Sequence, residues 1–342
     1  MNRETLETTA RAIVADGKGL LAADESMGTI KKRFASIDLE STEENRRAYR
    51  ELLFTTEGVE AYISGVIMFD ETIHQSTQNG TPFASVLASR GIIPGIKVDL
   101  GAKDMAGFPG EKVTEGLDGL RERLAHYKEL GARFTKWRAV ITIGAGIPTA
   151  ACLHANAHAL ARFAALSQEI DLVPIVEPEV LMDGDHDIQL CAEVTEATLR
   201  SVFAELAEQR VYLEGTLLKP NMVLPAKGSP RQANPEEIAE ATLRTFRRVV
   251  PAAVPGIVFL SGGQSPEEAT RNLNAINRMA MGKYPWKLSF SYGRALQDYT
   301  LKAWKGQAAN VAAAQKLFYH RARCNSAAAL GKYTPEMEKE AV

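Results

Sequence analysis

The sequence has 342 residues, of which 45% are hydrophobic and 24% charged, and this is ordinary for a globular protein that buries a sizeable core. The formal net charge of −2, without a block of basic residues, argues against nucleic acid or a membrane as a partner. The three cysteines show no metal-ligand spacing and no disulfide framework, and we find neither a signal peptide nor a membrane-spanning apolar run. We therefore expect a cytoplasmic protein.

Strand and helix patterns alternate along the whole chain. Apolar, β-branched runs predict strands at 19–24, 61–70, 92–99, 134–143, 172–177, 212–219, 256–261 and 286–291. Helical spacing predicts helices at 3–16, about 43–58, 117–130, 149–169, 187–209, 234–249, from 265, 294–304 and 306–330. The run Ser41–Glu44 reads as a capping box, and Pro266 suits the first position of a helix.

Eight strand–helix units in a chain of this length predict an α/β fold, a closed (β/α)8 TIM barrel with additional N- and C-terminal helices. We expect a single domain over residues 1–342, with a polar C-terminal tail from about 331. A doubly wound open sheet is the alternative. Its usual Gly-rich turn after the first strand is missing, because Gly17 and Gly19 lie at the start of that strand and not after it.

Polar side chains follow the predicted strands at their carboxyl ends, where barrel enzymes carry their chemistry. In chain order these are Asp24, Asp70, Lys97 with Asp99, Lys136 with Arg138, Glu177 with Glu179, Lys219, Ser261 to Gly263, and Ser291 with Gly293 and Arg294. A single polar residue at each strand end would be unremarkable, because every strand must end near water. Several lysines, several acids and an arginine together predict a catalytic ring.

Lys219 is the candidate nucleophile of this ring. Strand alternation over 212–219 puts it at the end of an otherwise apolar row. An amine attacks a carbonyl only when neutral, and desolvation or a neighbouring cation such as Lys136 favours that form. Glu177 and Glu179 can supply the acid–base groups that imine chemistry needs. The structural alternatives are a surface lysine beyond the core and a salt-bridged Glu-Pro-Glu loop.

The turn Ser261–Gly263 is a candidate phosphate site. Glycines let the backbone approach an anion closely, and N–H groups near a helix start favour phosphate. A plain tight turn is the alternative. The turn follows the seventh strand, and Gly293 and Arg294 follow the eighth, which is where barrels commonly bind phosphate.

Ten segments extend the pattern in order along almost the whole chain. They are GKGLLAADES (17–26), TEENRRAYRELL (42–53), GIKVD (95–99), KWRAV (136–140), VPIVEPEVLMDGDHD (173–187), YLEGTLLKPNMV (212–223), FLSGGQSPEEA (259–269), NLNAIN (272–277), FSYGRALQ (290–297) and GKYTP (331–335). With these segments the sequence resembles the class I, Schiff-base fructose-bisphosphate aldolases. The longer segments are far more specific than a lone Gly-rich loop.

The resemblance implies a barrel enzyme, usually a homotetramer, that reversibly cleaves fructose 1,6-bisphosphate to dihydroxyacetone phosphate and glyceraldehyde 3-phosphate without a metal or other cofactor. It implies that Lys219 forms the imine, Glu177 is the general acid, and Asp24 takes the C4 hydroxyl proton. Lys136 and Glu179 would be supporting charges. By the same resemblance, the C1 phosphate is bound by Ser261, Gly262, Gly263, Ser291, Gly293 and Arg294, and the rest of the substrate with its second phosphate by Ser26, Arg33, Arg46, Lys97 and Arg138.

The C-terminus departs from the family pattern. Animal members end on a tyrosine that helps to protonate the enamine left after cleavage, whereas this chain ends PEMEKEAV. Tyr333 belongs to the matching segment at 331–335 and is not a substitute by alignment. We therefore expect cleavage to survive and enamine protonation to be slower or to use another donor.

Three other classes of protein remain as alternatives. A pyridoxal phosphate enzyme would also need a lysine. A metal-dependent aldolase would need clustered histidines, and the six histidines form none near strand ends apart from His186. His154 and His158 are one helical turn apart, a spacing more typical of a helix surface. A catalytically silent sugar-phosphate-binding or scaffold barrel would not need Lys219.

Overall fold

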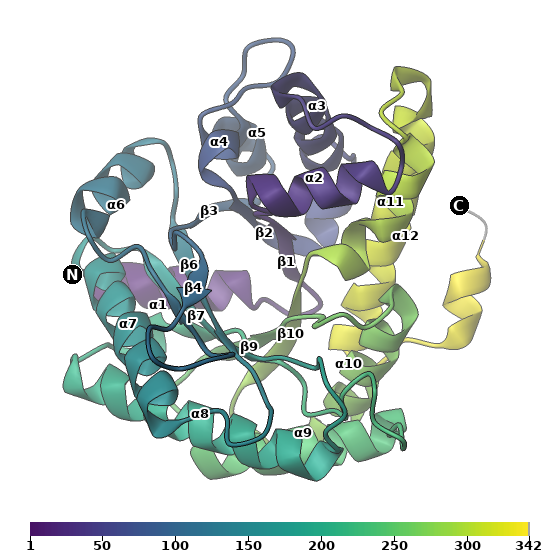
Figure 1. The fold of residues 1–342 in the computed structure, drawn as a ribbon. Coiled ribbons are helices and arrows are strands. Elements are labelled where there is room, and N and C mark those ends of the chain that lie inside the picture. Colours follow the sequence, from purple (N-terminus) through teal and green to yellow (C-terminus); the bar gives the residue numbers. More distant parts are fainter. Residues whose placement is uncertain (341–342) are drawn as a thin grey trace.

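The computed structural model describes residues 1–340, and eight of its strands close into a parallel barrel (Figure 1). The order around the barrel is β1–β10–β9–β8–β7–β6–β3–β2. The strands are β1 (Gly19–Ala23), β2 (Ile63–Met68), β3 (Ile93–Lys97), β6 (Phe134–Ile141), β7 (Val173–Val180), β8 (Leu217–Leu218), β9 (Gly256–Phe259) and β10 (Lys287–Tyr292). The predicted (β/α)8 barrel is confirmed, and the open sheet is excluded.

Helices surround the barrel (Figure 1). They are α1 (Arg3–Ile13), α2 (Met27–Ala35), α3 (Glu43–Phe54), α4 (Asp70–Ile73), α5 (Phe83–Ser89), α6 (Leu120–Glu129), α7 (Ala150–Glu169), α8 (Ile188–Glu208), α9 (Pro235–Val249), α10 (Pro266–Ala280), α11 (Arg294–Trp304) and α12 (Val311–Ala329). None of these helices is both long and apolar enough to cross a membrane.

Helix starts agree with local capping chemistry. Reciprocal capping boxes begin α9 at Asn234 and α10 at Ser265, each with proline at the first helical position. The cap of α3 was predicted one residue too early, because Thr42 rather than Ser41 accepts the N–H of Asn45. Two further differences are that α2 occupies a polar stretch for which no helix was predicted, and that α12 begins at Val311 after a short 3-10 turn.

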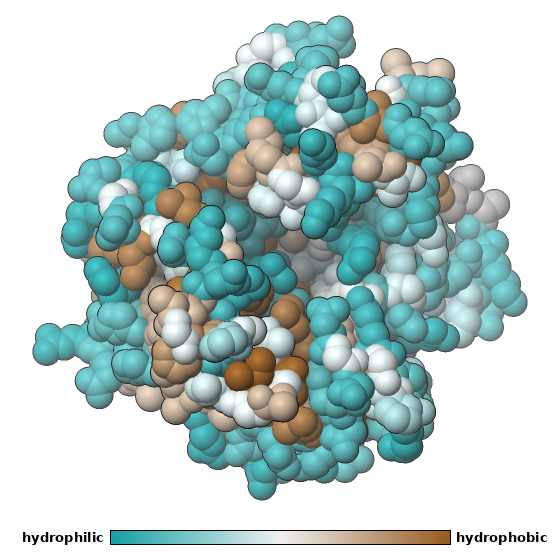
Figure 2. Space-filling view, viewed as in Figure 1, coloured by the Kyte–Doolittle hydropathy of each residue, from teal (hydrophilic) through white to brown (hydrophobic). Residues whose placement is uncertain are grey.

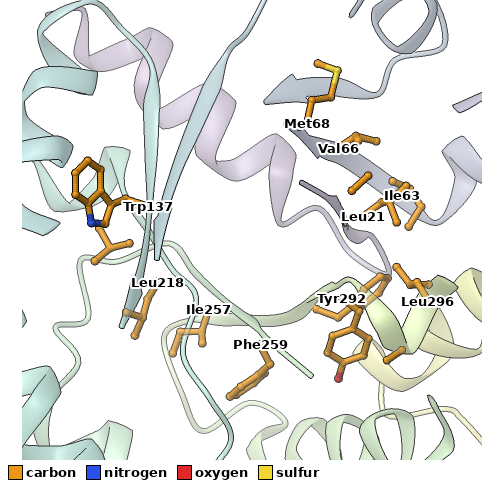
Figure 3. Packing of buried hydrophobic residues seen from close by; sticks show 14 of the residues in the cluster. Leu21, Ile63, Val66, Met68, Trp137, Leu218, Ile257, Phe259, Tyr292 and Leu296 are labelled. Atoms are coloured by element: carbon orange, nitrogen blue, oxygen red, sulfur yellow. The ribbon is translucent and has the colours of Figure 1, made fainter. Parts of the chain in front are cut away.

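Strand alternation divides the apolar side chains between two cores. Leu21, Val66, Trp137 and Phe259 face outward and pack between the strands and the surrounding helices (Figure 3). Neighbouring positions on the same strands face inward, where Leu20, Ala22, Ile67, Phe134, Val173, Ile175, Leu217 and Val258 form a separate cluster. The barrel is therefore a packed core and not a pore.

Helix α1 closes the amino end of the barrel. Its buried residues Leu6, Ala10 and Ile13 pack in the same cluster as the inward-facing side chains. Phe134 fills the interior next to Gly95, where an added Cβ would lie 2.2 Å from the phenyl ring. The amino half of the barrel is thus apolar and closed, which leaves the carboxyl half for chemistry.

The strand predicted at 212–219 is mostly wrong, because Leu213–Gly215 is a 3-10 turn and β8 has only two residues. The side-chain amide of Gln168 donates to the carbonyls of Tyr212 and Gly215, so it satisfies backbone groups that strand pairing would otherwise have satisfied. An added Cβ on Gly215 would lie 2.7 Å from Leu6 Cβ, which shows how closely this turn packs on α1. Lys219 still follows the inward-facing Leu217 at the predicted alternation.

Strand β7 is longer than predicted, running past Glu177 to Val180, so the salt-bridged loop is excluded. Strand alternation turns the backbone nitrogen of Pro178, which carries no hydrogen, toward β8. Because β8 ends before this level of β7, no hydrogen bond between the strands is lost there. The next N–H on that side, from Val180, donates to the side chain of Asn221 at 3.1 Å. Glu177 and Glu179 are thereby held on one regular strand, both facing the barrel axis.

Candidate active site

A cavity of about 1300 Å³ opens at the carboxyl ends of the strands. Figure 2 shows this face of the molecule, where hydrophilic residues predominate around the hollowed centre. Fifteen of the sixteen predicted site residues line the cavity: Asp24, Ser26, Arg33, Lys97, Lys136, Arg138, Glu177, Glu179, Lys219, Ser261, Gly262, Gly263, Ser291, Gly293 and Arg294. The barrel thus brings together groups that are as much as 270 residues apart (294 − 24).

Four ionisable groups are linked in a row at the base of the cavity. Glu177 lies between two amines, with Lys219 Nζ 3.1 Å from Oε1 and Lys136 Nζ 3.1 Å from Oε2. Lys136 Nζ also lies 2.5 Å from Asp24 Oδ2. The contact of Lys136 with Glu177 is close but poorly aligned for a hydrogen bond, and it is therefore an ion pair.

Burial and pairing set the charges of this row. Burial alone would raise the pKa of Glu177, but Lys136 and Lys219 outweigh it and hold the pKa below its ordinary value. Burial likewise opposes ionisation of Asp24, yet the same two lysines keep its pKa well below the usual range. Burial would lower the pKa of Lys136, and its two carboxylate neighbours raise it instead. At neutral pH the site therefore holds two carboxylates and a charged Lys136.

Two further pairs line the wall of the cavity. Lys97 Nζ lies 3.1 Å from Asp99 Oδ1, and Arg138 Nε lies 2.5 Å from Glu179 Oε2. The other carboxylate oxygen of Asp99 accepts the backbone N–H of Arg138 at 3.1 Å, which ties β3 to β6. Lys97 and Arg138 are thus each neutralised by a neighbouring carboxylate, Asp99 and Glu179 respectively. These ion pairs fix the orientation of the two cations before any ligand enters.

Glu25 is a buried acid that sequence reasoning missed. It accepts hydrogen bonds from Arg33, from Arg50 at 2.7 Å and from Gln297 at 3.0 Å. Arg33 lines the cavity, so Glu25 fixes a cation that the sequence analysis did predict. The only sequence signal was the position of Glu25 next to Asp24 at the end of the first strand.

The turn after β9 has the geometry of an anion site. Gly262 and Gly263 have φ of 54° and 84°, the left-handed region that favours glycine, and α10 begins three residues later. An added Cβ on Gly263 would lie 2.7 Å from Lys227 Nζ and 3.3 Å from Arg294 Nη2. Two cations therefore flank a turn whose backbone has no side chains in the way. Lys227 was missed because it lies in the irregular segment after β8, where no periodicity marks it.

Arg46 is the predicted site residue that the barrel does not bring to the cavity. Its guanidinium forms two parallel hydrogen bonds with Glu71, at 2.7 and 2.6 Å, and a third with the carbonyl of Ser41. This bidentate pair fixes α3 to α4. A role of Arg46 in binding substrate stays a prediction, and the structure offers no direct contact for it.

The described part of the C-terminal tail lies away from the cavity. Its 3-10 turn, η4 (Pro335–Lys339), is attached to α12 through Arg321, which donates a hydrogen bond to Glu338, and Tyr333 within the tail donates to the same carboxylate. None of residues 331–340 lines the cavity. The predicted departure at the C-terminus falls partly on residues 341 and 342, which lie outside the described residues.

Within residues 1–340, one group of three side chains has the spacing of metal ligands, namely His320, Cys324 and Glu338. It lies on α12 and the tail, and none of its members lines the cavity. The histidine-bearing pair His154 and His158 lies on the surface of α7, where both rings contact the carboxylate of Glu205.

The fold is a (β/α)8 barrel with a cavity lined by charged groups at the carboxyl ends of its strands. A family model described as fructose-bisphosphate aldolase class-I matches residues 5–342. A relative from Xanthomonas campestris pv. campestris, described as a probable fructose-bisphosphate aldolase class 1, is 60% identical over 97% of this chain and 99% of its own length. The cytosolic fructose-bisphosphate aldolase 4 of Arabidopsis thaliana is 57% identical over 96% of this chain and 84% of its own length.

A solved structure agrees with these relatives. The fructose-bisphosphate aldolase of Plasmodium falciparum, in a complex with TRAP and a small-molecule inhibitor, superposes with a TM-score of 0.95 at 52% identity, covering 97% of this chain and 95% of that one. The chain therefore belongs to the class I fructose-bisphosphate aldolase family. It is a carbon–carbon lyase that reversibly cleaves fructose 1,6-bisphosphate to dihydroxyacetone phosphate and glyceraldehyde 3-phosphate.

Proposed function

We propose that Lys219 carries this cleavage by forming a Schiff base with the ketose carbonyl. The observation that carries the proposal is the position of Glu177, whose two oxygens each lie 3.1 Å from a lysine amine. A carboxylate in contact with a nucleophilic amine can relay protons from its nitrogen to the carbonyl oxygen. The first proton turns that oxygen into the hydroxyl of the carbinolamine as the C–N bond forms, and the second lets the hydroxyl leave as water.

The depressed pKa of Glu177 makes the order of these steps specific. Because Lys136 and Lys219 keep Glu177 ionised, it must first act as a base and only afterwards as the general acid. Lys136 remains charged beside it and steadies the negative charge on Glu177 and on Asp24. Glu179 supports the site indirectly by pairing with Arg138.

Asp24 is proposed to take the proton of the C4 hydroxyl. As the C3–C4 bond breaks, its electron pair moves into the protonated imine and leaves an enamine on Lys219, so the imine serves as the electron sink. No metal is needed for that role, and activity should survive exhaustive chelation. Loss of activity with a chelator, restored by a metal ion, would contradict the proposal.

The phosphate of the bound half of the substrate is proposed to lie on the turn Ser261–Gly263. Arg294 and Lys227 flank the turn. Ser291 supports the assignment, because its hydroxyl is buried without a hydrogen-bond partner among the described residues and it lines the cavity. Ser26, Arg33, Lys97 and Arg138 are left for the other end of the substrate.

Borohydride reduction in the presence of dihydroxyacetone phosphate tests the imine directly. Reduction converts the imine to a stable secondary amine, and peptide mapping should find the adduct on Lys219. The Lys219→Met variant should lose at least about 10⁴-fold in kcat. An adduct on another lysine, or a Lys219→Met variant with unchanged turnover, would refute the assignment.

The tail is proposed to take no part in enamine protonation, since Glu338 and Glu340 pair with Arg321 and Arg323 of α12. Deleting residues 336–342 should leave the exchange of deuterium into dihydroxyacetone phosphate unchanged. A slower exchange with unchanged cleavage would show that the tail supplies the proton.

We further propose a single domain over 1–342, a cytoplasmic location and a homotetramer. The single domain is supported by α1 and α12, which come from opposite ends of the chain and pack onto the same barrel. The second is supported by the cytosolic descriptions of the plant relatives. The third rests on family resemblance, and light scattering of the purified protein tests it.

A further inference from the structure

The second cluster of titratable side chains lies on α12 and the tail. His320 and Cys324 are four residues apart on α12, so both point from the same helix face. Glu338 approaches them from η4. His320 Nε2 lies 3.6 Å from Cys324 Sγ and 3.7 Å from Glu338 Oε2, and the three candidate ligand atoms all lie within 4.8 Å of one another.

These separations match those of ligands around one small ion. Zinc bonds of about 2.0–2.1 Å to nitrogen, 2.3 Å to sulfur and 2.0–2.2 Å to oxygen place neighbouring tetrahedral ligands roughly 3.3–3.6 Å apart. Of the two distances from His320 Nε2, the 3.6 Å to Cys324 Sγ lies within this range and the 3.7 Å to Glu338 Oε2 slightly exceeds it, so small side-chain rotations would admit an ion. We propose that His320, Cys324 and Glu338 bind a zinc-type divalent ion, with water as the fourth ligand, and that the ion fastens the tail to α12.

The choice of metal follows from the ligands. A thiolate and an imidazole favour zinc and its chemical relatives over calcium or magnesium, which prefer oxygen. The Cys324 side chain is buried, whereas His320 and Glu338 are 11% and 21% exposed, so an ion can enter from the side of the tail.

Arg321 is the group that competes with the ion, because it also contacts Oε2 of Glu338. Its guanidinium has two further acceptors, the carbonyl of Pro266 at 3.1 Å and the hydroxyl of Thr270 at 2.5 Å, and would keep both. Tyr333 donates to the other carboxylate oxygen at 2.9 Å and keeps the carboxylate oriented.

Charge balance makes it possible for the ion to replace Arg321 at Oε2 of Glu338. Zinc binds cysteine as the thiolate, so the Cys324 thiol releases its proton to solvent as the ion binds. The thiolate and the Glu338 carboxylate then carry two negative charges against the two positive charges of the ion. Arg321 therefore faces a neutral centre and not an additional cation.

Cobalt(II) titration of the intact chain tests the site. Cobalt replaces zinc in such sites, and a thiolate ligand gives an intense charge-transfer absorption. We expect one ion per chain with this absorption, and its loss on adding zinc. The Cys324→Ser variant should lose the absorption, whereas Cys191→Ser, which removes another buried thiol on α8, should retain it.

A second measurement guards against a variant that fails to fold. Zinc should raise the Tm of the parental chain, and His320→Gln and Glu338→Gln should each reduce that rise. Aldol cleavage should be unchanged in all variants, because none of these residues lines the cavity. No cobalt absorption in the parental chain, or an absorption that survives Cys324→Ser, would overturn the proposal and leave the cluster as an ion pair between the tail and α12.

Discussion

The two ends of the barrel interior bury different kinds of side chain from the same strands, apolar at one end and charged at the other. At the amino end, Phe134 and Ile175 pack with α1 in an apolar cluster. Two residues further along each strand, Lys136 and Glu177 face the same interior and are both only 3% exposed. Alternation thus decides which side chains point inward, and the level along the strand decides whether they are apolar or charged.

This difference separates stability from function. Burying ions costs free energy, and pairing offsets that cost only in part. The apolar end stabilises the barrel, and the charged end uses that rigidity to hold Lys219, Glu177, Lys136 and Asp24 within contact distance. Changes at one end should therefore affect the free energy of unfolding, and changes at the other should affect turnover.

After Lys219→Met, replacing Glu177 with glutamine should give the largest effect, a loss of about 10²–10⁴-fold in kcat, because an amide cannot relay the proton. Glu179→Gln is the matched control on the same strand face. It pairs with Arg138 and touches neither lysine, so it should lose far less. Single-turnover cleavage and borohydride trapping measure both variants. Equal losses of kcat in the two variants would contradict the proposal that Glu177 in particular relays the proton.

Leu6→Ala tests the apolar end. Leu6 is fully buried beneath the barrel, and its truncation should lower the free energy of unfolding by about 2–5 kcal/mol. The kcat of the folded variant at 25 °C should stay unchanged, because the cavity opens at the other end. Urea unfolding and steady-state kinetics on one preparation make the comparison. A large fall in kcat would show that the two ends are coupled.

Asp24→Asn tests how pairing holds the charged end together. A carboxyl whose pKa is depressed on folding adds stability above its unfolded value, near 3.8, and this contribution fades as the pH falls through that value. The parental free energy of unfolding should therefore fall more steeply between about pH 5 and pH 3 than that of Asp24→Asn. Urea unfolding at several pH values measures the slopes, and parallel curves would contradict the pairing.

Lys227→Met should give the smallest effect. An exposed cation beside a bound phosphate contributes up to about 1 kcal/mol, so KM for fructose 1,6-bisphosphate should rise about two- to fivefold with kcat little changed. The effect should shrink as ionic strength rises. Lys283→Met, on an exposed loop after α10, is the control. If the two variants have the same KM at low salt, Lys227 does not contact the phosphate.

Local patterns predicted most of the fold. The strand–helix alternation, the proline starts of α9 and α10, and the acids and lysines at strand ends were readable because periodicity and capping act over a few residues. The lengths of two strands, β7 and β8, were predicted wrongly, because long-range contacts determine where these strands begin and end. Asn221 satisfies the backbone beyond Pro178, and Gln168 satisfies the backbone of the turn before β8.

By itself the sequence determined which residues could do chemistry and on which face of each strand they lie. Only the tertiary structure decided which of them meet. Barrel closure and strand register set Lys219 and Lys136 on opposite oxygens of Glu177, paired Arg46 with Glu71 outside the cavity, and brought Lys227 to Gly263. Such contacts join residues far apart in the chain, so no local period encodes them.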